Sequence, residues 1–186
     1  MERGHQEALA PLVAEVMRDA GLAFDRLDRV AVTIGPGSFT GLRVGLAFAK
    51  GLALALDIPC IGVGTLEALA AGRTGFIASV IDARRDQIYL QCFDGAESLM
   101  APDSLPLAEA AARLAELWGG GPAALVGPGA PLLDGMLAGA IAAPAFWCDP
   151  VALAHLAAGR PDRGSPAPLY LRAPDARTIA ERQAGA

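Results

Sequence analysis

The sequence predicts an α/β protein with a substantially parallel sheet, because short apolar segments typical of strands alternate with longer segments of helical periodicity. Hydrophobic residues make up 53% of the 186 residues and charged residues 19%, a composition that supports a packed core and excludes a disordered chain. Aromatic residues account for only 5%, so the core must consist mainly of aliphatic side chains.

The spacing of apolar residues places the elements along the chain. Helical periodicity predicts helices over residues 9–20, 40–56, 65–71, 107–118 and 151–158. Short apolar runs predict strands over residues 28–35, 58–63, 76–82, 87–93 and 123–126. A charged turn over residues 83–86 would join two strands, and the proline-rich segment 161–174 should be extended. A change of composition near residues 72–75 suggests two lobes and a tail, over residues 1–74, 75–160 and 161–186.

Charge and hydropathy narrow the class of function. The 15 Lys and Arg stand against 20 Asp and Glu, and this net charge of −5 disfavours a nucleic-acid-binding module that acts alone. The longest apolar run, residues 44–56, is shorter than the about 20 residues that a membrane span needs, and no signal core is present. We therefore expect a soluble cytoplasmic protein without membrane contact. Cys60, Cys92 and Cys148 lack metal-site spacing and are expected to be buried thiols.

A glycine-rich loop, GPGSFTG at residues 35–41, lies between a predicted strand and a predicted helix. Its glycines allow a tight turn and a close backbone approach, and its hydroxyl groups can cap the helix. The loop could bind an anion or nucleotide at the helix N-terminus through Gly35, Gly37, Ser38, Thr40 and Gly41. Its spacing matches neither a Walker A loop nor GxGxxG, so a strand-to-helix turn that needs glycines for packing is the favoured interpretation.

The predicted helix over residues 40–56 is apolar around almost its whole circumference and carries a ridge of small residues. The sheet can cover one face of this helix. The opposite face either packs on the helix of residues 9–20 within one subunit, or both helices dock on a partner subunit. We expect such a partner interface, with Leu46 pointing outward. Its residues would be Leu9, Leu12, Val13, Val16, Leu42, Gly45, Leu46 and Ala49.

Three motifs carry a resemblance to a known family. They are AVTIGPGSFTGLRVGLAFAKGLALALDIPCIGVGTLEALA at residues 31–70, IDARRDQIY at residues 81–89 and PLYLR at residues 168–172. Their order and spacing resemble the TsaB (YeaZ) family, the dimerisation subunit of the bacterial complex that makes N6-threonylcarbamoyladenosine at adenosine 37 of tRNA. The resemblance implies an actin-like/Hsp70-like ATPase fold of two small RNase-H-like lobes. The N-terminal hairpin of the family has no counterpart in this sequence, so the first lobe should lack those strands.

The resemblance further implies a non-catalytic scaffold subunit without catalytic residues, metal or cofactor. Its implied partners are the catalytic paralogue TsaD and the ATPase TsaE, with tRNA contacted only through the complex and a homodimer as an alternative for the free chain. In the paralogue two histidines bind the metal, whereas Thr65 and Leu69 stand at the matching positions here. A glycine-rich loop of the paralogue is replaced by a turn with the bulky Arg84 and Arg85.

Two other classes of function stay open. The chain could be a small nucleotide-binding ATPase or kinase-like enzyme that uses the GPGSFTG loop, or a metalloprotease, although the sequence offers no metal triad. It could also bind tRNA directly, although the sequence has no stripe of basic and aromatic residues. His5 and His155 are expected at the surface or at helix ends, and Asp82 and Asp86 are expected to cap and pair within their turn.

Overall fold

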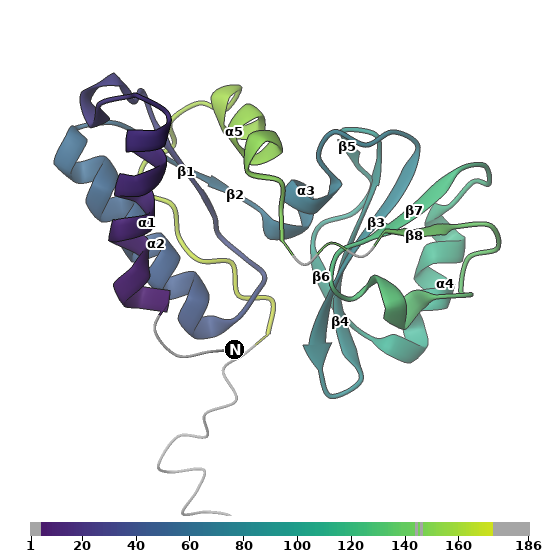
Figure 1. The fold of residues 1–186 in the computed structure, drawn as a ribbon. Helices are drawn as coiled ribbons and strands as arrows, with labels where there is room; N and C mark the ends of the chain where they lie inside the picture. The colour runs from purple at the N-terminus through teal and green to yellow at the C-terminus, as the bar shows by residue number, and fades with distance from the viewer. Residues whose placement is uncertain (1–4, 144, 146, 173–186) are drawn as a thin grey trace, which may run out of the picture.

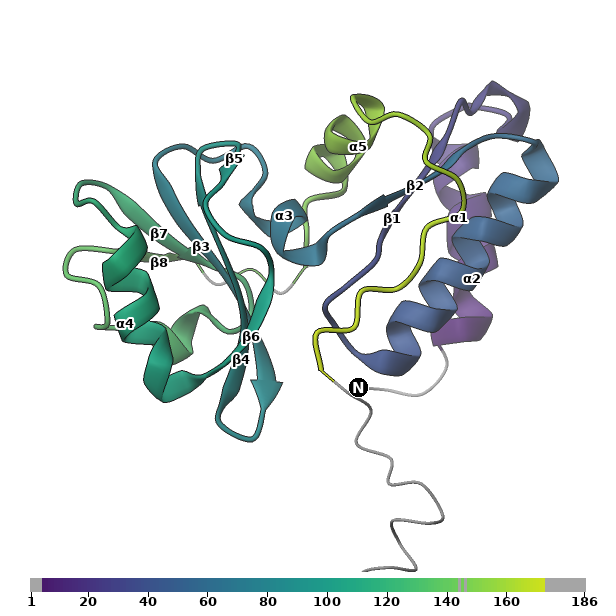
Figure 2. The same cartoon turned by 180° about the vertical axis from the view of Figure 1, so that it is seen from behind.

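The computed structural model describes residues 5–143, 145 and 147–172, which form two sheets with helices packed around them (Figures 1 and 2). A first region contains a two-stranded sheet with three helices, and a second region contains a six-stranded sheet with one helix. A short helix connects the two. The elements before the second sheet are α1 (His5–Asp19), η1 (Phe24–Arg26), β1 (Val30–Thr33), α2 (Phe39–Leu56), β2 (Cys60–Val63) and α3 (Thr65–Ala70).

The first region is built on the parallel pair β1 and β2, in which Val30 lies opposite Cys60. Because side chains alternate across a strand, β2 presents Ile61 to one face of the sheet and Cys60 to the other. Ile61 packs with Ala157 of α5 (Pro150–Ala158), whereas Cys60 lies beside α2. α1 lies next to α2 in both views (Figures 1 and 2), and none of residues 7–19 is buried. The first region therefore has only a thin core.

The second region is built on a mixed sheet with the strand order β5-β4-β3-β7-β8, in which β6 also pairs with β4. β3 pairs antiparallel with β4 and parallel with β7, and β7 pairs parallel with β8. Residues 76–80 of β3 are all buried, as expected for a central strand covered on both faces. The elements are β3 (Phe76–Arg84), β4 (Gln87–Asp94), β5 (Glu97–Ser98), β6 (Asp103–Pro106), α4 (Leu107–Leu117), β7 (Ala123–Val126), η2 (Ala130–Leu133) and β8 (Ile141–Ala143).

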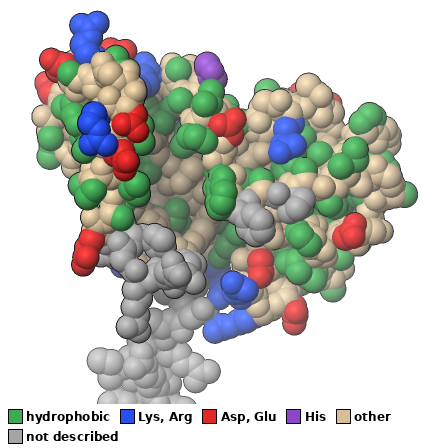
Figure 3. Space-filling view, viewed as in Figure 1, with side chains coloured by type: hydrophobic (Ala, Val, Ile, Leu, Met, Phe, Trp, Pro, Cys, Tyr) green, Lys and Arg blue, Asp and Glu red, His purple; other side chains and the backbone are tan. Residues whose placement is uncertain are grey.

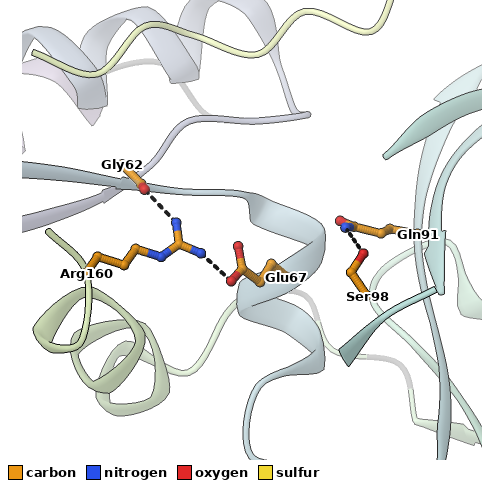
Figure 4. Close-up of polar contacts among 5 residues, drawn as sticks. All are labelled: Gly62, Glu67, Gln91, Ser98 and Arg160. Atoms are coloured by element: carbon orange, nitrogen blue, oxygen red, sulfur yellow. Dashed lines mark hydrogen bonds and ion pairs between the residues drawn. The ribbon is translucent and has the colours of Figure 1, made fainter. Parts of the chain in front are cut away.

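The segment after α5 returns across the first sheet and ties its elements together. Arg160 donates a hydrogen bond to the carbonyl oxygen of Gly62 at 2.8 Å and forms an ion pair with Glu67 of α3 (Figure 4). Further along, the backbone N–H of Leu169 donates to the carbonyl oxygen of Ile34 at 2.7 Å. This C-terminal segment, residues 160–172, thus covers part of the surface that a two-stranded sheet leaves open.

Most of the predicted elements are confirmed, with their bounds shifted by a few residues. The prediction of a substantially parallel sheet is correct for β1 and β2 but wrong for the second sheet, which is mixed. The sequence analysis missed β5, β6 and β8, because strands of two to four residues at sheet edges carry almost no periodic signal. The C-terminal segment has neither helix nor strand as far as Arg172, and the last two residues of the predicted extended stretch lie outside the described residues.

The structure shows which face of α2 is buried and corrects one prediction about the cysteines. α2 is buried on one face only, through Leu46, Ala49 and Ala53, whereas Leu54 is 83% exposed. By length and composition alone α2 could cross a membrane, but its buried face packs on the chain's own β1. Cys92 is buried as predicted, whereas Cys60 and Cys148 are only half-buried, because they lie beside cavities rather than inside a core.

Candidate functional site

A cavity of about 600 Å³ lies where the two regions meet, and it gathers the segments that the sequence analysis singled out. One side is the glycine-rich loop before α2, and the opposite side is formed by β3, β4 and the start of their turn. α3 and the segment before α5 complete the wall. The lining residues are Pro36, Gly37, Ser38, Thr65, Leu69, Ile81, Asp82, Ala83, Arg84, Tyr89, Pro128, Trp147 and Cys148.

The glycine-rich loop is shaped by packing and helix capping. Gly35 has a φ of +114°, and a Cβ atom there would lie 2.6 Å from the carbonyl oxygen of Leu169. Ser38 is the N-cap of α2, and its Oγ accepts a hydrogen bond from the backbone N–H of Gly41 at 3.2 Å. A Cβ at Gly41 would lie 2.5 Å from that Oγ. These contacts explain two of the glycines by packing, and anion binding by Gly35, Gly37, Ser38, Thr40 and Gly41 stays a prediction.

The turn between β3 and β4 is strained and charged. Arg84, Arg85 and Asp86 all have positive φ values, of 64°, 55° and 54°, which are unusual for residues other than glycine. Asp82 stabilises the turn, because its Oδ1 accepts from the backbone N–H of Arg84 at 2.7 Å and its Oδ2 pairs with the Arg84 guanidinium at 3.1 Å. The prediction that Asp82 caps and pairs locally is therefore confirmed. Arg84 and Arg85 are both exposed, and Arg84 lines the cavity.

The part of α3 that lines the cavity carries no strong metal ligand. Thr65 and Leu69 line it from α3, and neither side chain is a strong metal ligand. Within the described residues no group of three or more His, Cys, Asp and Glu side chains lies close enough together to hold a metal ion. Burial raises the pKa of the Cys148 thiol, so this group stays protonated and weakly nucleophilic at neutral pH.

The predicted interface residues are divided by the structure between the surface and the core. Leu12 and Val16 of α1 are 53% and 64% exposed, and Leu9, Val13 and Leu42 are half-buried. A Cβ at Gly45 would have no neighbour within 4 Å, so this position opens to solvent. The expectation that Leu46 points outward is wrong: Leu46 and Ala49 are each 5% exposed, because the helix phase turns them toward the chain's own sheet. Leu54, which the sequence analysis did not name, is the most exposed apolar side chain of α2.

Two helix-flanked sheets that meet at a shared cavity define the class of protein: an actin-like, RNase H-like ATPase fold. Its solved relatives include YeaZ from Pseudomonas aeruginosa, which superposes with a TM-score of 0.74 at 28% identity over 92% of this chain and 86% of that one. A second Pseudomonas aeruginosa structure, of a protein with similarity to peptidase YEAZ, has a TM-score of 0.78 at 28% identity over 91% and 85% of the two chains.

Sequence comparison leads to the same family. The family model described as "TsaD: tRNA N6-adenosine threonylcarbamoyltransferase" matches residues 1–123. The tRNA threonylcarbamoyladenosine biosynthesis protein TsaB of Bacillus subtilis is 42% identical over 92 residues, which are 48% of this chain and 40% of that protein. Protein Rv3421c of Mycobacterium tuberculosis is 38% identical over an alignment of 195 positions, which covers 96% of this chain and 80% of that protein. The chain belongs to the TsaB/YeaZ family, and its match spans less than half the length of the Bacillus relative.

Proposed function

We propose that the chain is a non-catalytic scaffold subunit required for threonylcarbamoylation of adenosine 37 in tRNA. The observation that carries this proposal is the α1–α2 face, defined here by Leu12 and Val16 of α1, the helix that lies next to α2 (Figures 1 and 2). These two aliphatic side chains lie one helical turn apart and are 53% and 64% exposed. Exposed apolar patches of this kind on soluble proteins mark surfaces that bind another protein. The partner in this proposal is a TsaD-type catalytic subunit, the family whose model the chain also matches.

The proposed role is binding because the cavity provides a poor centre for chemistry. A metalloprotease or metal-dependent transferase would need strong ligands at Thr65 and Leu69, the two α3 residues that face the cavity. An ATPase or kinase that uses the GPGSFTG loop is the second candidate. Its support is the N-terminus of α2 at the cavity wall, where backbone N–H groups and the helix dipole favour anions. Gly35 and Gly41 are already accounted for by packing, so this candidate rests on the dipole alone.

The complex as we propose it contains the TsaD-type subunit and a TsaE-type ATPase, and it works in the cytoplasm, where tRNA is modified. The same α1–α2 face would allow the free chain to form a homodimer, with two helices from each copy packed as a bundle. Both assemblies would use one surface, so partner and homodimer would exclude each other. Titration of the chain with the TsaD-type subunit should therefore convert dimers of the chain into heterodimers.

The function is tested by complementation. A bacterial strain depleted of its own TsaB should regain N6-threonylcarbamoyladenosine in its tRNA when the chain and its cognate TsaD-type and TsaE-type subunits are supplied together. The nucleoside content of the tRNA is measured by mass spectrometry. Omission of the chain should abolish the modification. Turnover of ATP or of a peptide by the purified chain alone would contradict the non-catalytic role.

The interface is tested by charge insertion into the α1–α2 face. Leu12→Arg and Val16→Arg should each abolish binding of the TsaD-type subunit in size-exclusion chromatography, because the interface would bury an unpaired charge. Both should leave the circular dichroism spectrum unchanged, since the side chains contact solvent in the free chain. Ile141→Arg on β8 is the matched control, because Ile141 is 72% exposed in the second region. Full binding by folded Leu12→Arg and Val16→Arg variants would place the interface elsewhere.

A further inference from the structure

We propose that the chain itself contacts RNA, through a patch that the fold assembles at the junction of the two regions. This junction patch consists of Phe39, Arg43, Tyr170, Arg172, Arg84 and Arg85. The ligand it fits is the phosphate backbone of RNA. The proposal deepens the proposed function, on which it rests, because it gives the non-catalytic subunit a direct part in holding the tRNA.

One half of the junction patch lies where α2 meets the C-terminal segment. The Arg43 guanidinium lies 3.7 Å from the centre of the Phe39 ring, and its Nε donates a hydrogen bond to the Tyr170 hydroxyl at 3.1 Å. The rings of Phe39 and Tyr170 contact each other with their centres 5.5 Å apart. These contacts hold the guanidinium in one orientation, and the bond to Tyr170 uses only one of its five N–H donors. Phe39 and Tyr170 are 47% and 43% exposed.

The other half lies on the β3–β4 turn, and the C-terminal segment joins the two halves. Arg172 follows Tyr170 by two residues, a span of at most about 7 Å. Its guanidinium donates a hydrogen bond to the carbonyl oxygen of Ala83 at 2.9 Å. Arg84 and Arg85 come next along the turn, and the Arg84 side chain is 83% exposed. The patch is therefore continuous from the start of α2 to the tip of the β3–β4 turn.

The charge of the junction patch is opposite to that of the whole chain. Four arginines gather there against two carboxylates of the same turn, Asp82 and Asp86, although the chain has a net charge of −5. Figure 3 shows basic side chains grouped at the lower end of the junction, with acidic ones beside them. The N-terminus of α2 lies on the same side, at the wall of the cavity that Arg84 also lines, and its dipole adds positive potential.

The chemistry of the patch selects RNA over other anions. Guanidinium groups bind phosphate with paired hydrogen bonds, and exposed aromatic rings beside them provide surfaces on which unpaired bases stack. Patches that combine arginine with aromatic residues are typical of proteins that bind single-stranded segments of RNA. Arg43, Arg84 and Arg85 are exposed, so the arginines follow an open surface rather than one enclosed pocket. That arrangement suits a backbone with several phosphates better than a single nucleotide.

The test uses the salt dependence of tRNA binding by the chain together with its TsaD-type partner. Each phosphate contact contributes about 0.7–0.9 to the slope of log K against log salt concentration. The double variant Arg84→Gln/Arg85→Gln should lower the magnitude of this slope by about 1.4–1.8 relative to the wild type. Arg43→Gln, on the other side of the junction, should lower it by about 0.7–0.9. The control pair Arg73→Gln/Arg163→Gln removes two exposed arginines outside the patch and should leave the slope unchanged.

The outcomes separate this proposal from the proposed function. A slope that stays at the wild-type value in both patch variants overturns the RNA contact, as does an equal decrease in the control pair. Formation of N6-threonylcarbamoyladenosine is assayed in parallel with wild-type chain. Failure of that assay contradicts the proposed function, while the slopes still decide the RNA contact. If circular dichroism shows that the double variant does not fold, the slope of Arg43→Gln alone decides whether the chain contacts RNA.

Discussion

The two regions of the molecule differ in how completely their sheets are covered. In the second region β3 is buried along residues 76–80, and the sheet has a core cluster on each face, one with α4 and η2 and the other with Leu69 and Ala70 of α3. In the first region all four residues of β1 are only half-buried, and α1 adds no buried side chain within residues 7–19. A parallel sheet is normally covered on both faces, and two strands alone are too few to make a stable sheet.

The larger core and the proposed partner surface lie in different regions of the molecule. The second region has the larger cluster of buried apolar side chains, and the first packs α2, α5 and the C-terminal segment around two strands. The side chains that the first region leaves exposed are the ones that the proposed partner would cover. In the proposed function the partner surface lies in the first region and the larger core in the second, and substitutions can test each of them separately.

The largest expected effect is the loss of a core side chain from the second region. Leu114→Ala should lower the free energy of unfolding by about 2–5 kcal/mol, because Leu114 of α4 is fully buried and its removal leaves a cavity. Leu22→Ala, the same substitution in the first region, should stay within about 0.5 kcal/mol, because Leu22 is 52% exposed. Urea denaturation measures both. Equal losses would mean that the two regions are equally well packed.

A smaller effect is expected where the C-terminal segment is attached to the first region. Arg160→Ala should cost about 1–3 kcal/mol, because it leaves the Gly62 carbonyl and the Glu67 carboxylate without their partner. Limited proteolysis should then cleave within residues 161–172 faster than in the wild type. Glu67→Gln keeps an acceptor for Arg160 and should cost less. If Arg160→Ala unfolds at the wild-type urea concentration, the first region does not depend on this attachment.

The smallest effect is a pH dependence that distinguishes the thiols of the two regions. Burial in the core of the second region raises the pKa of the Cys92 thiol to about 12, and the nearby Arg113 acts in the opposite direction with a smaller effect. The folded state therefore favours the protonated thiol more strongly than the unfolded state does. The contribution of this thiol to the free energy of unfolding is complete below pH 9 and is lost as the pH rises toward 12. Between pH 8 and 10 the wild type should lose about 1 kcal/mol more than Cys92→Ala in urea titrations.

The control for this prediction is a thiol of the first region. Cys60 is half-buried, and burial raises its pKa while the nearby Lys50 lowers it. Cys60→Ala should therefore change the pH dependence less than Cys92→Ala does. An identical change for both variants would show that the two regions shield their thiols equally.

The sequence predicted the regular elements well where a periodic pattern was long enough. The helices now seen as α2 and α4, and the strands β3, β4 and β7, were all placed within a few residues of their observed bounds. The edge strands β5, β6 and β8 were missed, because their pairing depends on neighbours rather than on their own residues. The family was also evident from the sequence, because the order and spacing of GPGSFTG, IDARRDQIY and PLYLR resemble it.

The candidate site could be predicted only in part. The sequence marked the glycine-rich loop, Thr65 and Leu69 separately, and the fold brings them to one cavity. The helix phase of α2 was misjudged at Leu46, because a helix that is apolar on nearly all sides has no pattern to indicate which side faces the sheet. The exposed Leu54 was missed for the same reason.

Local order along the chain was therefore determined by the sequence itself: alternating strands and helices, the cap at Ser38 and the charged turn after Asp82 follow from residue type and spacing. Three things were decided only by the tertiary structure. They are the face of α2 that stays exposed, the cavity between the regions, and the junction patch that joins Arg43 and Tyr170 to the β3–β4 turn. The physical reason is sequence separation: residues more than a hundred positions apart, such as Arg43 and Tyr170, show no periodic relation before the chain folds.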